Sequence, residues 1–105
     1  MKPNQLQLLF DTFDSVRHQN GQEYWFAREL YERLGYSSWD TFKPTLERAK
    51  DSVKTQKIPV ENHFQDVTKM VEIGSGASRE TKDIRLTRYA AYMIALNGDP
   101  RKPEI

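Results

Sequence analysis

Basic side chains gather near the C-terminal end of the sequence, where their type and spacing suit phosphate binding. Four of them fall within ten residues and are opposed by two carboxylates: Arg79, Lys82, Arg85 and Arg88 against Glu80 and Asp83. If residues 82–86 form a strand, Lys82 and Arg85 point to opposite faces. Arg79 and Lys82 then flank a mobile loop that could reach a phosphate backbone with salt-sensitive affinity. The alternative is that Arg85 and Arg88 pair with carboxylates of the same domain.

A second group of cations lies on a helix that the sequence predicts to end near residue 53. Ser38 or Asp40 is a natural N-cap for this helix. Its basic side chains point away from its apolar stripe and include Lys43, Arg48 and Lys50. A helix precedes it across a short turn, and such a pair resembles a helix-turn-helix unit, although many helical hairpins bind nothing. A basic helix beside a basic hairpin is also the general layout of winged-helix DNA binders.

Residues that would indicate catalysis or metal binding are scarce. The chain has two histidines, His18 and His63, and no cysteine, and no paired His spacing of a zinc hydrolase occurs. The glycine-rich run at 74–78 lacks the Gly-Lys-Ser/Thr ending of a phosphate loop. The carboxylates are scattered beside Lys and Arg, as on an ordinary surface. We therefore expect a binding module that is not an enzyme and that has no cofactor and no metal.

The aromatic side chains offer a rival interpretation. Trp25 precedes a helix directly and is expected in the core, whereas Trp39 could be core or partly exposed. Exposed Tyr24, Tyr36 or Trp39 could anchor a protein partner, because aromatic residues dominate interface hot spots.

Composition fits one small domain with modest charge asymmetry. The 105 residues are 37% hydrophobic and 30% charged, with a net charge of +1. Residues 1–42 carry four Lys/Arg and six Asp/Glu, against twelve and nine in residues 43–105, so the two parts are −2 and +3. This bias does not by itself identify a nucleic-acid binder. No apolar run approaches the ~20 residues of a membrane span, and no signal peptide is evident, so we expect a cytoplasmic protein.

The elements that must position these residues follow from periodicity and turn signals. Leu6, Leu9, Phe10 and Phe13 predict a short first helix that Asn4 could cap. Asn20-Gly21 predicts a hairpin with strands near 15–18 and 23–26. Residues 27–34 form the clearest helix, ended by Gly35.

The second half of the sequence is less regular. The helix that ends near residue 53 has an inner stripe of Phe42, Leu46, Ala49 and Val53. Residues 63–73 suit a helix or a strand, and we favour a strand near 68–73 paired with one near 82–86. Thr87 should cap a last helix, residues 88–97, that forms the buried spine. The fold class is α+β, a small helical domain with short β-hairpins.

Several segments together resemble the damage-inducible protein D family and its N-terminal Bro-N-type domain. They are residues 23–30, 34–36, 42–50, 63–64, 69–75, 82–92 and 97–100, of which 82–92 with 97–100 is the strongest. The resemblance runs from about residue 13 to the end. It implies a small α+β DNA-binding domain of a kind also found in phage antirepressors. It assigns no catalytic residues.

The expected organisation is a single domain over residues 1–105. Residues 1–12 are expected to be an N-terminal extension and residues 101–105 a tail. The resemblance implies that a further helical region follows this tail.

The main hypothesis is a DNA-binding domain of a damage-response or phage-type regulator. The sequence leaves open whether the DNA is single- or double-stranded. The candidate contacts are Ser38, Lys43, Arg48, Lys50, Arg79, Lys82 and Arg85. The alternative is a protein-interaction module that docks on a repair or recombination protein or on a repressor. A homodimer is compatible with either, and no membrane partner is expected.

Overall fold

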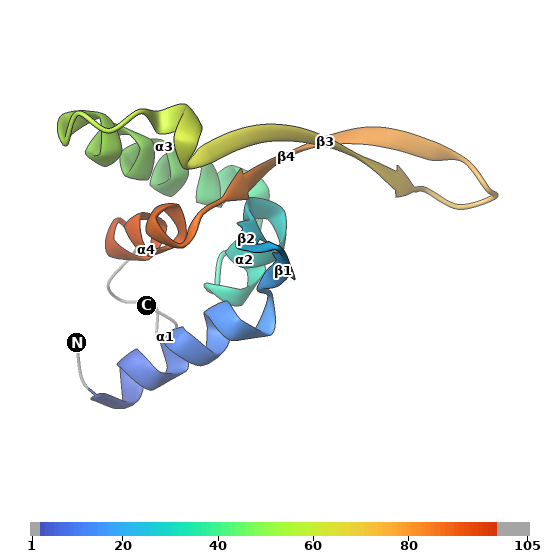
Figure 1. Ribbon diagram of the computed structural model, residues 1–105. Coiled ribbons are helices and arrows are strands. Elements are labelled where there is room, and N and C mark those ends of the chain that lie inside the picture. The colour runs from blue at the N-terminus through green and yellow to red at the C-terminus, as the bar shows by residue number, and fades with distance from the viewer. Residues whose placement is uncertain (1–2, 99–105) are drawn as a thin grey trace.

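The computed structural model describes residues 3–98, with side chains from residue 7 onward. Along the chain it has α1 (Pro3–Ser15), β1 (His18–Asn20), β2 (Gln22–Phe26), α2 (Ala27–Arg33), α3 (Trp39–Thr55), the 3₁₀ turn η1 (Val60–Asn62), β3 (Phe64–Glu72), β4 (Ser78–Leu86) and α4 (Arg88–Leu96). The four strands form an antiparallel sheet in the order β1-β2-β4-β3. The α+β class predicted from the sequence is confirmed (Figure 1).

The first helix and hairpin differ in detail from the prediction. Helix α1 starts at Pro3, so Asn4 lies inside its first turn and is not its N-cap. The helix also continues to Ser15, whose hydroxyl donates to the Thr12 carbonyl, and strand β1 starts only at His18. The hairpin turn itself is confirmed, with Gly21 at a φ of 79°, a conformation that glycine adopts without steric cost.

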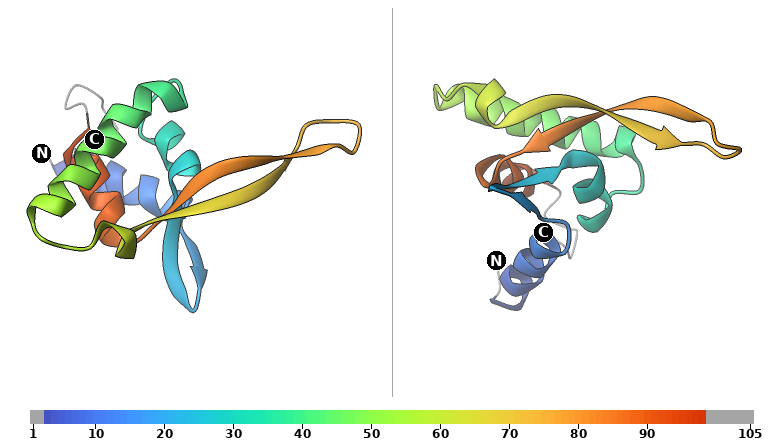
Figure 2. Two further views of the ribbon diagram at one scale, coloured as in Figure 1. Left: turned by 90° about the horizontal axis from the view of Figure 1, so that it is seen from above. Right: turned by 45° about the vertical axis from the view of Figure 1, so that its right-hand side comes forward.

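Strands β3 and β4 form a long two-stranded ribbon, called here the β-arm (residues 64–86). The strands pair over nine residues each, from Phe64 opposite Leu86 to Glu72 opposite Ser78. The predicted pairing is confirmed, but both strands are longer than expected. Strand β2 pairs with only the last two residues of β4, so the rest of the β-arm projects from the helical body (Figures 1 and 2).

The tip of the β-arm is a closed turn rather than an open loop. The Ala77 amide donates to the Gly74 carbonyl at 2.9 Å, and the Ile73 amide donates to the Ala77 carbonyl at 3.0 Å. Gly74, Ser75 and Gly76 all have positive φ angles, which explains the glycine-rich composition of the turn. The cations that flank the tip are therefore held on paired strands.

Helix α3 begins and packs as its sequence predicts. The Ser38 side chain accepts a hydrogen bond from the Thr41 amide, and the Thr41 side chain completes the capping box. The inner stripe is buried throughout and consists of Phe42, Leu46, Ala49 and Val53. The cap and the stripe together explain why the helix tolerates Pro44, which can donate no backbone hydrogen bond.

The core lies between the helices and the inner face of the sheet. Trp25 is fully buried, as predicted, and its indole N–H donates to the Phe13 carbonyl of α1 at 2.9 Å. Helix α4 contributes Ala90, Ala91, Ile94 and Ala95 to the core and lies between α3 and α1 (Figure 1). Its Thr87 cap is confirmed by a hydrogen bond from the Ala90 amide. Leu96 departs from the expected spine, because its side chain is exposed.

Candidate nucleic-acid interface

The β-arm carries the two candidate cations that are free for a ligand. Arg79 and Lys82 are exposed on β4, and their side chains make no ion pair within the described residues. Along a strand they alternate in direction, so Arg79 shares a face with Arg85 while Lys82 points to the other face. The projecting segment 65–82 holds three basic and three acidic side chains, so its net charge is zero.

The base of the β-arm brings Lys82 close to the start of α3. The Lys82 carbonyl accepts a 2.6 Å hydrogen bond from the Arg28 guanidinium, which also lies 4.3 Å from the centre of the Trp39 ring. A small hollow of about 120 Å³ lies here between Arg28, Trp39, Asp66, Lys82, Asp83 and Ile84. Trp39 is half-buried and directly follows the predicted candidate Ser38. No local pattern singles out Arg28, because its neighbours here come from two other elements.

The candidates on α3 mostly have partners within the domain. Ser38 is engaged in the capping box, and Lys43 and Lys50 lie 3.3 and 3.7 Å from carboxylates on the same helix, Asp40 and Glu47. Arg48 donates to the Thr45 hydroxyl and to the Asn97 carbonyl at the end of α4, at 3.1 and 3.0 Å. Arg48 therefore ties α3 to α4, and the helix does not present a uniformly basic face.

Arg85 lies on an aromatic cluster and pairs with no carboxylate among the described residues. Its guanidinium is 4.0 Å from the centre of the Tyr24 ring, on which His18 also stacks with ring centres 5.2 Å apart. Beside them Lys69 lies 3.2 Å from the centre of the Phe26 ring. We call His18, Tyr24 and Phe26 the aromatic cluster. It anchors the base of the β-arm to the β1–β2 hairpin through cation–π contacts.

Asp83 is the buried charge of this region. Its carboxylate accepts hydrogen bonds from the Arg28 and Ile84 amides at 3.1 and 2.7 Å, and it lies 3.0 Å from the Lys69 ammonium. Arg28 is in the first turn of α2, whose N-cap residue Phe26 makes no side-chain cap bond. Asp83 therefore supplies from β4 the acceptor that a local cap would have provided, and joins the β-arm to α2.

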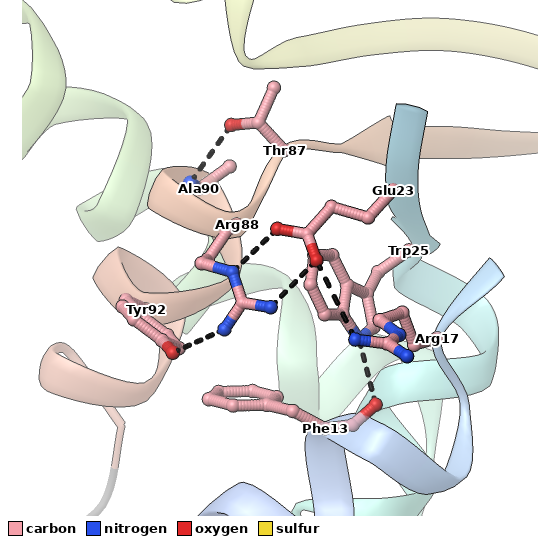
Figure 3. Close-up of polar contacts among 8 residues, drawn as sticks. All are labelled: Phe13, Arg17, Glu23, Trp25, Thr87, Arg88, Ala90 and Tyr92. Carbon is pink, nitrogen blue, oxygen red and sulfur yellow. Dashed lines mark hydrogen bonds and ion pairs between the residues drawn. The ribbon is translucent and has the colours of Figure 1, made fainter. Parts of the chain in front are cut away.

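Arg88 is a structural residue, as one of the two interpretations of the sequence proposed. Its guanidinium donates to both carboxylate oxygens of Glu23, at 2.5 and 2.6 Å, and to the Tyr92 hydroxyl at 2.7 Å (Figure 3). The hydrogen bond from Arg88 lowers the pKa of Glu23 below its ordinary value, and the same bond raises the pKa of Arg88. Arg17 lies 3.8 Å from the same carboxylate. This pair joins the β1–β2 hairpin to α4.

The aromatic side chains considered as exposed anchors for a protein partner are buried or half-buried. Tyr36, expected to be an exposed anchor, is buried, and its hydroxyl lies 3.0 Å from that of Thr45. Tyr24 and Trp39 are half-buried.

His63 lies between η1 and β3, with its Nδ1 atom 2.7 Å from the Thr87 hydroxyl. Among residues 3–98 no group of three or more acidic or histidine side chains could hold a metal ion, and no helix is long and apolar enough to cross a membrane.

Comparison with known proteins places the chain in a family. The model of the N-terminal domain of the BRO family, Bro-N, matches residues 12–105. DNA damage-inducible protein D of Escherichia coli strain K12 is 48% identical over 95 residues, which are 89% of this chain and 35% of that protein. The chain thus spans about a third of the length of this relative. No solved structure matches it. The chain belongs to the BRO family, as an N-terminal domain of the Bro-N type.

Proposed function

We propose that this domain binds DNA and serves a regulatory role in which it is not itself a catalyst. The single observation that carries the proposal is the projecting β-arm, whose cations Arg79 and Lys82 are exposed and make no ion pair with any described residue. Membership in the Bro-N family and the similarity to a DNA damage-inducible protein support the regulatory part.

The dimensions of the β-arm suit a duplex. Nine residues per strand, at about 3.3 Å per residue, give a ribbon roughly 30 Å long. A two-stranded ribbon of this kind fits the major groove, where its cations can contact phosphates on either side. Arg79 and Lys82 point to opposite faces of the ribbon and could therefore contact different strands of the duplex.

The candidate residues differ in how much they can contribute. Arg79 and Lys82 should contribute most to DNA affinity. Ser38 and Lys43 come next, because these two residues lie at the N-terminal part of α3 near Trp39. Arg85 contributes through the N–H groups at the edge of its guanidinium, whose face lies against the Tyr24 ring. Arg48 and Lys50 rank last, because Arg48 is bound to Thr45 and Asn97, and the Lys50 side chain is 23% exposed against 57% for Lys43.

Charge reversal of the β-arm tests this proposal. We expect Arg79→Glu and Lys82→Glu each to weaken binding to a fluorescent duplex, measured by anisotropy between 50 and 200 mM salt. Each phosphate contact contributes about −0.9 to the slope of log affinity against log salt, so the slope should become shallower by about one for each variant.

Lys54→Glu is the matched control, because Lys54 is exposed at the far end of α3 and makes no ion pair within the described residues. It changes the total charge as much as either test variant. If all three variants lose affinity equally, the effect is one of net charge and the β-arm is not the contact surface. If affinity is unchanged in folded Arg79→Glu and Lys82→Glu, the proposal fails.

A second candidate function is protein recognition by the same β-arm. Its outer part exposes Met70, Val71 and Ile73, with 66%, 42% and 57% of their surfaces accessible, and its charge is balanced. Exposed apolar side chains on a ribbon with open strand edges favour pairing with another protein. This alternative predicts that Met70→Ser and Ile73→Ser leave the DNA affinity intact but abolish binding to the protein partner.

A further inference from the structure

A polar cavity lies at the end of the sheet, where β2 diverges from β4. Its volume is about 350 Å³, which falls in the range of roughly 300–1,000 Å³ found for small-ligand sites. It is lined by residues of β2, η1, the start of β3 and the end of β4, together with His63 and Thr87. The cavity is separate from Arg79 and Lys82, which do not line it.

Side-chain amides dominate the hydrogen-bonding capacity of this cavity. Gln22, Asn62 and Gln65 are exposed, and their side chains make no hydrogen bond within the described part of the chain. Each amide can donate and accept at once. The edges of nucleobases require this combination, because they alternate donors with acceptors.

The charges in the cavity are one cation and one free carboxylate. The Glu23 carboxylate is already neutralised by its two hydrogen bonds from Arg88. Glu61 is exposed and makes no ion pair within the described residues. Arg85 is held on the ring of Tyr24, which also lines the cavity. The Glu61 carboxylate could accept a hydrogen bond from an amino group, and the Arg85 guanidinium could donate one to a phosphate.

The aromatic wall is not free for stacking. The Tyr24 ring already contacts both the Arg85 guanidinium and the His18 ring. A base in this cavity would therefore be recognised mainly through its edge, by the amides and by Glu61, rather than through its face.

We propose that this cavity holds one unpaired cytosine of a nucleic-acid strand. Its exocyclic amino group would donate to Glu61, and its phosphate would accept hydrogen bonds from Arg85. Carboxylates recognise cytosine in this way because its N4 amino group is a donor where thymine has an acceptor. The inference rests on the proposed DNA binding and adds a site for an unpaired base to it.

A base-exchange experiment tests the site. Anisotropy titrations compare fluorescent dC10 with dT10 at one salt concentration, so that phosphate contacts are equal. A well-placed contact to a base edge discriminates by about 1–3 kcal/mol, so wild-type protein should prefer dC10 by roughly tenfold. Glu61→Ala should abolish this preference, so that the affinities for dC10 and dT10 become equal. Free dCMP, measured by calorimetry, should bind far more weakly than dC10.

Glu32→Ala is the matched control, because Glu32 is an exposed carboxylate on α2 without a side-chain partner in the described residues, and it should keep the preference. Equal affinity of the wild type for dC10 and dT10, or an unchanged preference in folded Glu61→Ala, would overturn the cavity assignment alone. If dCMP binds as tightly as dC10, the site takes free nucleotides and the strand assignment is wrong. Failure of the wild type to bind any DNA would instead refute the proposed function itself.

Discussion

Replacing Asp83 with alanine should destabilise the domain more than any other exchange of a charged residue on the β-arm. The Asp83 side chain is 1% exposed, and its carboxylate accepts two backbone hydrogen bonds and contacts the Lys69 ammonium at 3.0 Å. Alanine would leave two amides without an acceptor and Lys69 without its counter-charge. The substitution would also remove the acceptor at the start of α2.

The expected magnitude follows from these contacts. Removing one partner of a buried ion pair costs about 3–5 kcal/mol. The Lys69 side chain is 34% exposed, so water can rehydrate it and we expect a loss near the lower figure, about 3 kcal/mol. Asp83→Asn keeps the shape and an accepting oxygen but loses the charge, and should cost about 1–2 kcal/mol. Small domains are stable by only about 5–15 kcal/mol, so both losses are measurable.

Urea denaturation followed by tryptophan fluorescence measures these losses. The urea midpoint should fall in the order wild type, Asp83→Asn, Asp83→Ala, with an unchanged slope. Asp66→Ala is the control, because Asp66 is an exposed carboxylate on the neighbouring strand that makes no ion pair within the described residues. It should stay within about 0.5 kcal/mol of the wild type. If Asp83→Ala costs less than 1 kcal/mol, or no more than Asp66→Ala, then Asp83 does not join the β-arm to α2.

Two further predictions concern pairs that join distant elements. Arg88 lowers the pKa of Glu23 below its ordinary value of 4.5, so the stabilising effect is fully present above that pH and is lost as the pH falls through the lowered pKa. Thermal melts between pH 7 and pH 3 should therefore show a shallower acid decline for Glu23→Gln than for the wild type, and identical declines would contradict the pairing. Arg48→Ala should cost about 1 kcal/mol, because it loses its bonds to Asn97 and Thr45. The salt dependence of DNA binding by Arg48→Ala should match that of the wild type. A shallower slope of log affinity against log salt would instead identify Arg48 as a phosphate contact.

Much of the secondary structure could be predicted because its signals are local. The stripe of α3, the caps at Ser38 and Thr87 and the turn at Gly21 each depend on residues that are close together in the sequence. Strand boundaries were less accurate. The extent of β3 and β4 depends on their pairing with each other, which an isolated segment does not reveal.

The candidate site shows the same division. The cations at 79–88 are visible in the sequence, but a sequence does not say which of them have internal partners. Arg88 meets Glu23 across 65 residues and is bound within the fold, whereas Arg79 and Lys82 form no ion pair with residues in the described part of the chain. Tyr36 was expected at the surface, yet it is buried where α3 supplies a hydroxyl partner.

By itself, the sequence determined the helices, the turns, the family resemblance and the absence of a cysteine-based or paired-histidine site. These features depend on residue type and short spacing, which the chain carries in any conformation. Only the tertiary structure decided which charged side chains are paired within the domain, that the ribbon 64–86 projects from the body, and that amides from two strands and η1 line one cavity. Those outcomes depend on contacts between segments far apart in the chain, and the chain must fold before such contacts exist.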